Sequence, residues 1–547
     1  MKFTKSPYVW LPLWIAIGIA LGIFIGNTFS IFKSRHSLFN RGDKLEAVLE
    51  YINDSYVDSI NLQELVEDAI PDLVTGLDPH STYISAKDLD MVNEDLEGHF
   101  SGIGVQFSIL NDTIVVISVI SGGPSSAAGI VAGDRIVKVQ DKEFVGKTLT
   151  NELVMRNLRG AKGSSVKLGI KHFDSAKIVP ITVKRGDIPV NTVDASFSIA
   201  KGVGYVKVDK FGSTTYSEFI NALSKLKAEG VKSIIIDLRQ NTGGYMQAAE
   251  MMVNEFFPKN QLVVFAEGRN FPRDAYYSDG SGTFQNEQVV VLVDEGSASA
   301  SEIFAGAIQD TDRGLIIGRR TFGKGLVQQQ REFKDGSALR LTVARYHTPS
   351  GRCIQKAYTR GKSEDYQMDL MNRYLRGEMD NQDSIKFSKG MPLFKTKGGR
   401  PIRGNDGIMP DIFVPRDTIG INSYYLNVVN KGYAYEYAIR YIDRNRTMLK
   451  SFKKWQHLAG FLQNQSLVEN LVEYALQKGV NRRPYLIDES YDLLQRQLIA
   501  NIIRPLFGES AYFQYVLKDD VLLKRAIGLV HSQKATREAI VSQRYKK

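Results

Sequence analysis

A serine nucleophile is the first chemistry that the sequence suggests. The run GSASASEIF holds Ser297, Ser299 and Ser301; it follows a predicted apolar strand (289–293) and opens a predicted helix (299–309). A serine on a sharp turn from strand to helix exposes its hydroxyl, and the N–H groups that open the helix face any developing negative charge. Serines are also common helix caps, so a purely structural role for all three fits the same pattern.

Lys324 is the residue that could activate such a serine. It lies in the run TFGKG, which follows another predicted strand at 315–318. Because neighbouring strand ends of one sheet lie close together, the lysine can reach the serine turn, and burial would keep its amine neutral, as a general base requires. The alternative is a surface lysine in a glycine turn. A phosphate loop is not expected, because the glycine spacing that precedes the lysine in such loops is absent.

A Gly-Gly turn provides a third chemical element. The run DLRQNTGG ends a predicted buried strand, 233–238, and finishes with Gly243 and Gly244. Such turns present bare N–H groups to an anion, so either glycine together with the N–H of Ala300 could form an oxyanion hole. A tight turn without any ligand is an equally simple interpretation.

Other catalytic chemistries find less support. Of the seven histidines, His347 is the nearest candidate for a serine–histidine pair, while the run DPHS around His80 is expected to be a structural turn. The single cysteine, Cys353, lies in a turn-like run and is interpreted as incidental. Because no HxxxH or CxxC pattern occurs, we expect no metal site, and nothing in the sequence calls for a cofactor.

Short β-branched runs separated by glycine turns, from about 98 to 186, predict a small β-rich module. Within it the run HFSGIGVQF places a glycine loop, Gly102, Ile103, Gly104 and Val105, directly before a strand. Such a loop suits the terminal carboxylate of a peptide whose chain then adds to the edge of the sheet. Plain hairpin turns would contain the same glycines.

The elements that must position these residues fall into about three or four domains, as a length of 547 residues predicts. Amphipathic helices are predicted from about 40 to 90, and strands alternate with helices from about 190 to 350, which indicates an α/β core. A polar stretch at about 355–400 is expected to be an exposed excursion, and the pattern beyond about 420 is helical. The predicted fold is therefore α+β and multidomain.

The N-terminus predicts a membrane anchor. No charge occurs between Lys5 and Lys33, and the apolar stretch 10–25 lies within a segment long enough to span a bilayer. A cleaved signal peptide is the alternative, but no A-x-A-like site follows. The excess of Lys and Arg after the segment would by itself place the body of the protein in the cytoplasm. The net charge of +10 is spread along the chain, so nucleic-acid binding is not expected.

In this order the motifs resemble the carboxy-terminal processing (tail-specific) serine proteases, over about residues 40–416. The resemblance rests on seven runs: GLDPHSTY, GIGVQF…GGPSSAAGI…GD, DLRQNTGG, GSASASEIFAGAIQD, TFGKGLVQQ, TPSGRCIQ and DGIMPDIFVP. Each run is weak alone, whereas seven in sequence are highly specific. The family usually has proline where this chain has Thr242, which loosens the turn but leaves its glycines.

The resemblance implies a Ser–Lys mechanism. It assigns the nucleophile to Ser299 and the general base to Lys324, and it matches Gln328 to the residue that orients the lysine. The remaining matches are the oxyanion-hole positions Gly243, Gly244 and Ala300 and the supporting positions Glu302 and Thr321.

The sequence pattern and the resemblance together predict a domain order, in which the anchor and the helical C-terminal region come from the pattern alone. The expected parts are an anchor (1–35), an N-terminal helical region (36–92), an inserted PDZ domain (93–187), a serine protease core with ββα-type units (188–418) and a helical C-terminal region (419–547). The implied activity is that of a serine endopeptidase that recognises and cleaves the exposed C-terminal tails of protein substrates, with access controlled by the PDZ domain. Because the family generally works outside the cytoplasm, we expect the body on the periplasmic side despite the Lys and Arg imbalance.

Two other functions fit parts of the sequence. A non-catalytic PDZ adaptor would bind tails and recruit another protease, but it predicts decay of the catalytic positions, which are all present. A CoA-type acyl-transfer or hydratase fold uses similar Gly-Gly turns, but gives the Ser–Lys pair and the PDZ module no purpose. The helices at either end could pair copies of the chain into a homo-oligomer, and an adaptor protein could be a further partner.

Overall fold

The computed structural model describes residues 43–173, 175–387 and 391–531. The chain divides into two compact units, Met1–Gly76 and Leu77–Lys547, and each has its own architecture. The predicted anchor at 1–35 lies outside the described residues. Within the described ranges, no helix is both long and apolar enough to cross a membrane.

The described part of the first unit consists of two helices, α2 (Asp43–Ser55) and α3 (Leu62–Thr75). Asn61 caps α3, because its side-chain oxygen accepts the N–H groups of Gln63 and Glu64. Both helices agree with the amphipathic pattern that predicts helix from about 40 to 90.

The second unit begins with strand β1 (Thr82–Ile84) and helix α4 (Ala86–Glu97), followed by a β-rich module. The main sheet of this module has the order β3-β4-β5-β7-β8, with β6 paired to β5, so β3 is an edge strand. The strands and helices of the module are β2 (His99–Gly102), β3 (Val105–Leu110), β4 (Thr113–Val119), α5 (Pro124–Ala127), β5 (Arg135–Val139), β6 (Lys142–Glu143), α6 (Asn151–Leu158), β7 (Ser165–Lys171), β8 (Ile178–Lys184) and β9 (Gly186–Pro189). Strands β2 and β9 pair where the chain enters and leaves the module.

A six-stranded sheet of order β10-β11-β12-β15-β16-β21 forms the centre of the second unit. Its strands are β10 (Val193–Ala200), β11 (Val203–Val208), β12 (Ser233–Asp237), β15 (Gln288–Val293), β16 (Leu315–Gly318) and β21 (Ile412–Phe413). All neighbours are parallel except β10 and β11. Parallel strands buried on both faces are nearly all apolar, which explains the continuous apolar runs in the sequence.

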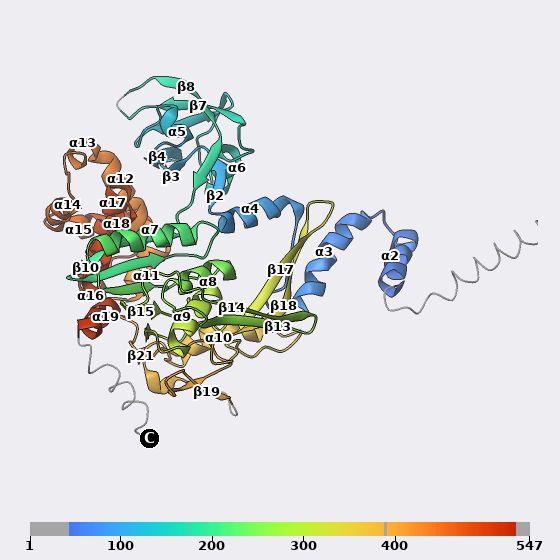
Figure 1. Ribbon diagram of the computed structural model, residues 1–547. Helices are drawn as coiled ribbons and strands as arrows, with labels where there is room; N and C mark the ends of the chain where they lie inside the picture. Colours follow the sequence, from blue (N-terminus) through green and yellow to red (C-terminus); the bar gives the residue numbers. More distant parts are fainter. Residues whose placement is uncertain (1–42, 174, 388–390, 532–547) are drawn as a thin grey trace, which may run out of the picture. The chain divides into compact units, whose positions relative to one another are not determined.

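Helices cover both faces of this sheet (Figure 1). One face packs against α7 (Thr215–Ala228), α8 (Met246–Asn254) and α9 (Ala300–Asp310). The other face packs against α19 (Val521–His531) at the end of the described chain. The alternation of strands and helices predicted from about 190 to 350 is confirmed.

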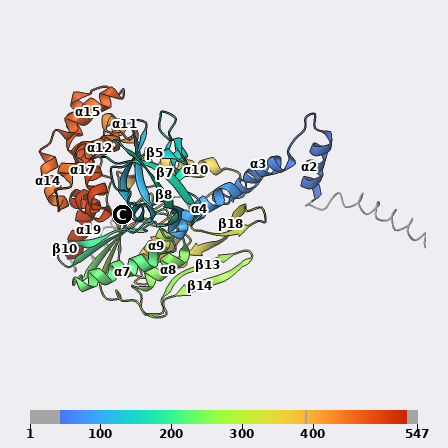
Figure 2. The ribbon, with the colours of Figure 1, turned by 90° about the horizontal axis from the view of Figure 1, so that it is seen from above.

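A second, antiparallel sheet adjoins the first. It has the order β1-β18-β13-β14, and Figure 2 shows the β13–β14 hairpin beside β18. Strands β1 and β13 pair with one edge of β18, and β17 pairs with the opposite edge. The strands are β13 (Leu262–Gly268), β14 (Phe271–Tyr277), β17 (Leu326–Glu332) and β18 (Ala338–His347). We call the run TFGKG at 321–325 the lysine loop. Because β17 starts two residues after Lys324, this sheet fixes the position of that loop.

The stretch at about 355–400 is not simply an exposed excursion, which corrects the expectation from its polar composition. It contains α10 (Ser363–Leu375), the 3-10 helix η2 (Gln382–Ser384) and the hairpin β19 (Leu393–Lys395) and β20 (Pro401–Arg403). Tyr366 and Arg373 on α10 are only 5% and 1% exposed. Polar and aromatic residues are therefore buried here through specific partners, which composition alone does not reveal.

Helices make up most of the described chain beyond about residue 420. They are α11 (Ser423–Asn430), α12 (Tyr433–Arg444), α13 (Arg446–Leu449), α14 (Trp455–Gln463), α15 (Leu467–Gln477), α16 (Pro484–Glu489), α17 (Tyr491–Phe507), α18 (Glu509–Val516) and η3 (Leu517–Asp519). Their apolar core also includes Leu110, Val115 and Ile117 from the β-rich module. The predicted combination of N-terminal helices, β-rich module, α/β core and helical C-terminal region is confirmed.

Candidate active site

Three loops meet at one edge of the central sheet. Strands β12, β15 and β16 are parallel neighbours with β15 in the middle, so their carboxyl ends lie at the same edge. The chain that leaves these three ends carries Gly243 and Gly244, then Ser299, then Lys324. The topology therefore brings together the three elements that the sequence suggests.

The three serines of this edge differ in what their hydroxyls do. Ser297 and Ser301 are fully buried, and their hydroxyls donate to the carbonyl oxygens of Leu238 and Asn241, both at 2.8 Å. Ser299 is partly exposed. Two of the hydroxyls are thus committed to backbone acceptors, and Ser299 is the serine whose side chain is open to a substrate.

The backbone of Ser299 is strained. Its φ of 56° and ψ of −115° lie in a region that non-glycine residues rarely adopt. Helix α9 begins at the next residue, so the serine stands on a sharp turn between β15 and the N-terminus of a buried helix. The N–H groups of Ser301 and Glu302 donate to the carbonyl oxygens of Ala298 and Ser299, whereas that of Ala300 finds no acceptor among the residues that the structure describes.

Glu302 ties the serine turn to the lysine loop. Its fully buried carboxylate accepts the N–H groups of Ser299 (2.9 Å) and Lys324 (2.8 Å) on Oε2. Its Oε1 accepts the N–H of Gly323 (2.7 Å) and the hydroxyl of Thr321 (2.5 Å). Burial raises the pKa of Glu302 to about 7, while these four hydrogen bonds act in the opposite direction by favouring the carboxylate.

Tyr346 forms a second bridge between the same two loops. Its hydroxyl lies 3.0 Å from the carbonyl oxygen of Ser299 and 2.7 Å from that of Lys324. Burial raises the pKa of Tyr346 far above its usual range, so the phenol keeps its proton. The backbones of Ser299 and Lys324 are therefore held together on both their N–H and carbonyl sides.

The amine of Lys324 is oriented by Gln328. Its Nζ donates to Gln328 Oε1 at 3.0 Å, and the lysine is partly buried. Burial lowers the pKa of Lys324, the positive charge of Arg340 lowers it further, and Glu302 acts in the opposite direction. A lysine with a lowered pKa holds a neutral, proton-accepting amine at lower pH than a free lysine does.

The turn around His80 supports Gln328, a role that the sequence interpretation missed. The amide nitrogen of Gln328 donates to the carbonyl oxygen of His80 at 2.5 Å. The turn is fixed by Asp78, whose Oδ1 accepts the N–H groups of His80 and Ser81, both at 2.9 Å. Burial and the charge of Lys324 lower the pKa of His80 to about 4, so its ring is neutral near pH 7. The run DPHS is the sequence feature that could have indicated this supporting role.

The Gly-Gly turn lies directly against the serine. A β-carbon added to Gly243, whose φ is +103°, would lie 2.7 Å from the Ser299 β-carbon and 3.0 Å from the Ala300 nitrogen. The N–H of Gly243 donates to Asn241 Oδ1 at 2.9 Å, whereas the N–H of Gly244 finds no acceptor among the residues that the structure describes. Of the two glycines, Gly244 is thus the one with an N–H available beside that of Ala300.

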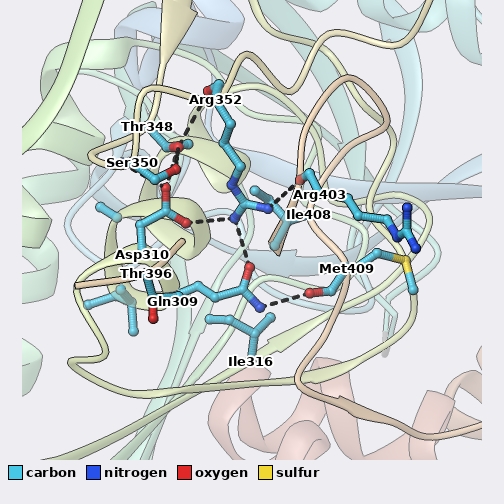
Figure 3. Close-up of polar contacts among 12 residues, drawn as sticks. Gln309, Asp310, Ile316, Thr348, Ser350, Arg352, Thr396, Arg403, Ile408 and Met409 are labelled. Atoms are coloured by element: carbon cyan, nitrogen blue, oxygen red, sulfur yellow. Dashed lines mark hydrogen bonds and ion pairs between the residues drawn. The ribbon is translucent and has the colours of Figure 1, made fainter. Parts of the chain in front are cut away.

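The opposite end of α9 is anchored by a buried ionic network (Figure 3). Arg352 and Asp310 are fully buried and form an ion pair at 2.8 Å. The guanidinium also donates to Gln309 Oε1 and to the carbonyl oxygen of Arg403, both at 2.8 Å. Thr348 donates its hydroxyl to Asp310. The TPSGR turn therefore fixes the C-terminal end of the helix whose N-terminal end carries Ser299.

The glycine loop of the β-rich module precedes its edge strand, as expected. Gly102 ends β2, Ile103 is buried, Gly104 has a φ of +73°, and Val105 begins β3. The carbonyl oxygen of Gly104 accepts the N–H of Ile120 at 3.1 Å, which holds the loop against the module. An extended peptide could pair with the free edge of β3 and place its terminus at this loop.

The remaining candidates lie elsewhere or have other partners. His347 stacks on Phe265, and its Nδ1 contacts the carbonyl oxygen of Gly351 at 3.1 Å. Burial raises the pKa of the Cys353 thiol, which makes it a poor nucleophile. Among the described residues, no group of three or more His, Cys, Asp or Glu side chains could hold a metal ion.

Three parts of the chain match known families. Residues 202–368 match the family described as Peptidase family S41, and residues 101–184 match the PDZ domain. Residues 424–508 match a Family of unknown function (DUF8443), which covers much of the helical C-terminal region.

Several proteins have sequences similar to more than half of this chain. A probable CtpA-like serine protease of Staphylococcus haemolyticus (strain JCSC1435) is 38% identical over 313 residues, 57% of this chain and 62% of that protein. The carboxy-terminal processing protease CtpB of Bacillus subtilis (strain 168) is 34% identical over 320 residues, 57% of this chain and 65% of that protein. A probable CtpA-like serine protease of Staphylococcus aureus (strain MRSA252) is 35% identical over 357 residues, 65% of this chain and 70% of that protein. The first two matches thus span less than two thirds of their relatives and the third slightly more. The chain belongs to the carboxy-terminal processing proteases of peptidase family S41.

Proposed function

We propose that the protein is a serine endopeptidase that cleaves protein substrates near their C-terminal tails, with Ser299 as nucleophile and Lys324 as general base. The observation that carries the proposal is the double bridge, through Glu302 and Tyr346, that holds the backbones of these two residues together. The open hydroxyl of Ser299 and the lowered pKa of Lys324 add support.

The reaction begins with proton transfer. The neutral Nζ of Lys324 takes the proton of the Ser299 hydroxyl, and Oγ forms a bond to the carbonyl carbon of the scissile peptide. Negative charge then develops on the carbonyl oxygen. The N–H groups of Gly244 and Ala300 are the donors available to stabilise it.

Breakdown of the intermediate restores the enzyme in two further steps. The Lys324 ammonium gives its proton to the leaving amine as the C–N bond breaks, and an acyl-enzyme on Ser299 remains. Water then attacks the acyl carbon, gives a proton to Lys324, and releases the carboxylic acid as the serine regains its proton. Gln328 keeps the amine aimed at the serine through both proton transfers, because its amide is fixed by the carbonyl oxygen of His80.

The PDZ domain would select and deliver the substrate. The tail's carboxylate would dock at the loop from Gly102 to Val105, and the extended chain would pair with the free edge of β3. Binding of the tail would shift the domain and open or align the catalytic cleft. Such a mechanism favours unstructured tails, because an extended strand must be free to pair along its whole length.

We also propose that the segment at 1–35 anchors the enzyme in a membrane, with the catalytic body outside the cytoplasm. The absence of charge between Lys5 and Lys33 and the apolar stretch at 10–25 support the anchor. Extraction of the full chain from membranes at high pH, and protease accessibility in intact cells, would test the anchor and its direction.

The central test is cleavage of an internally quenched peptide with an apolar C-terminus, supplied either as the free acid or as the amide. Ser299→Ala and Lys324→Ala should each abolish cleavage of the free-acid peptide without changing thermal unfolding. Near wild-type activity of Lys324→Ala would rule out the Ser–Lys mechanism. If wild-type protein binds the free-acid peptide but never cleaves it, the PDZ adaptor would be the better description.

A further inference from the structure

One face of helix α10 is directed at the lysine loop. Tyr366, Asp369 and Arg373 are three and four residues apart, so they lie on the same face of the helix. The guanidinium of Arg373 donates to the carbonyl oxygens of Arg320 (2.8 Å) and Thr321 (3.0 Å). The C-terminal part of α10 thus holds the backbone that leads into the loop.

Asp369 acts through Lys356, which is packed between two aromatic rings. The carboxylate pairs with Lys356 Nζ at 3.0 Å, and Nζ lies 3.9 Å from the ring centroid of Phe322 and 4.1 Å from that of Tyr366. The backbone N–H of Lys356 donates to the carbonyl oxygen of Gly323 at 3.0 Å. A largely buried cation therefore joins α10 to the two residues that precede Lys324.

The hydroxyl of Tyr366 joins two hydrogen-bonded arms. In the first arm it lies 2.8 Å from His80 Nε2, and the carbonyl oxygen of His80 accepts the amide of Gln328, which in turn binds Lys324 Nζ. In the second arm the amide of Gln355 donates to the same hydroxyl at 3.3 Å. Because the hydroxyl accepts from Gln355, its proton is free to be donated to a neutral His80 ring.

The second arm returns to the lysine loop. Gln355 Oε1 accepts the N–H of Gly325 at 2.8 Å, one residue beyond Lys324. A β-carbon on Gly325 would lie 2.8 Å from the backbone nitrogen of Gln355, so the backbones of these two segments are in direct contact. The arms therefore close a circuit that leaves the lysine at its amine and returns at the adjacent peptide group.

We propose that Tyr366 is a positioning residue for Lys324, and that helix α10 braces the general-base loop by closing this circuit. The inference rests on the proposed role of Lys324 as general base. With the hydroxyl in place, the carbonyl oxygen of His80 holds the Gln328 amide at a fixed angle, and Nζ stays aimed at Ser299. Without it, the side chains of His80 and Gln355 lose their common partner and Gln328 can turn away.

The test is Tyr366→Phe, which removes the hydroxyl but keeps the ring over Lys356. Against the quenched free-acid peptide, we expect kcat to fall roughly tenfold, as loss of one aligned hydrogen bond predicts, with KM within about twofold of wild type. The rising limb of the pH–rate profile should shift to higher pH, because a loosened site lets water reach the amine. The matched control is Tyr374→Phe, the same change at a half-exposed position of the same helix, which should alter neither value.

A double-mutant cycle separates positioning from a general loss of stability. If Tyr366 acts through Gln328, Tyr366→Phe should change kcat by no more than about twofold in a Gln328→Ala background. His80→Leu, which removes the imidazole but keeps the backbone carbonyl, should lower kcat as Tyr366→Phe does and add little to it. If Tyr366→Phe folds poorly, His80→Leu in the wild-type and Gln328→Ala backgrounds tests the same positioning circuit.

Two results would overturn the inference. One is wild-type kcat with an unchanged pH profile in Tyr366→Phe; the other is an equal loss of activity in the wild-type and Gln328→Ala backgrounds. Failure of the proposed function looks different, because Lys324→Ala would then remain active. If Ser299→Ala and Lys324→Ala are inactive while Tyr366→Phe is normal, only the role of α10 is wrong.

Discussion

Oxygen Oε2 of Glu302 accepts the backbone N–H of Ser299 at 2.9 Å, and the same atom accepts the N–H of Lys324 at 2.8 Å. The serine turn follows β15 and the lysine loop follows β16, so one carboxylate oxygen sets the separation of two loops from neighbouring strands. Glu302 itself lies on the first turn of α9, two residues beyond its first residue. The register between proposed nucleophile and base is thus fixed by the helix that follows the nucleophile.

Replacing Glu302 by glutamine keeps the shape of the side chain but should disable the site. The amide keeps one acceptor oxygen but turns an NH₂ toward N–H donors, so at least two of the four hydrogen bonds are lost. We expect kcat/KM to fall on the order of 100-fold, since small misplacements of reacting groups have effects of this size. The free energy of unfolding in urea should fall by about 1–3 kcal/mol.

The control for this change is Glu267→Gln, at a half-exposed carboxylate on β13. It should leave both kcat/KM and the urea midpoint unchanged. Wild-type activity in Glu302→Gln would show that the shared carboxylate does not hold the two loops in register.

The pH dependence of cleavage should report the amine of Lys324. Its pKa lies below the usual 10.5 because of burial and the charge of Arg340, and only the deprotonated amine accepts a proton. The value of kcat/KM should therefore rise with pH through the pKa of Lys324. Arg340→Gln removes a positive charge that disfavours the ammonium, so the pKa should rise and the limb should move to higher pH.

Glu302 provides an internal reference in the same profile. Its pKa of about 7 is set by burial and its own hydrogen bonds, so any acidic limb that it contributes should stay in place in Arg340→Gln. A limb that does not move at all, or that moves to lower pH, would contradict the assignment of the titrating base to Lys324.

The arrangement of the three loops could be predicted from the sequence, because parallel strands place their carboxyl ends at one edge. Apolar runs before the Gly-Gly turn, before Ser299 and before Lys324 predict that edge without knowledge of any contact. The choice among the three serines could not be made from the residues. It depends on the carbonyl oxygens of Leu238 and Asn241, which engage Ser297 and Ser301 only in the folded chain.

The supporting roles of Tyr346 and Tyr366 could not be predicted from the sequence for a similar reason. The hydroxyl of Tyr346 on β18 contacts the carbonyl oxygen of Lys324 directly, whereas that of Tyr366 on α10 reaches the lysine loop through Gln355. Neither hydroxyl has a local sequence signal. The polar composition around Tyr366 predicts exposure, whereas its partners Lys356, Asp369 and Gln355 make burial possible. The periodicity of apolar residues indicates which face of a helix or strand is buried. It does not indicate which polar side chains form hydrogen bonds with residues far away in the sequence.

Breaking the buried Arg352–Asp310 pair should strongly destabilise the core. Both side chains are fully buried, so Arg352→Leu leaves an uncompensated carboxylate and should lower the free energy of unfolding by about 3–5 kcal/mol. Urea unfolding in a Ser299→Ala background, which prevents self-cleavage, provides the measurement. Arg156→Leu is the matched control: its exposed pair with Glu152 should change stability by no more than about 1 kcal/mol. Equal effects of the two changes would contradict the structural role of the buried network.

The PDZ domain and the helical C-terminal region should share part of their stability. The outer face of the PDZ sheet contributes Ile117, 4% exposed, to the core of the helices, and Arg135 pairs with Asp443 of α12 at 2.6 Å. Ile117→Ala should destabilise by about 2–4 kcal/mol. Because the packing is continuous, hydrogen exchange should speed up in both β4 and α17. Val154→Ala, inside the core of the PDZ domain, should speed exchange in that domain alone. Loss of protection confined to the PDZ domain in Ile117→Ala would show that the helices do not support it.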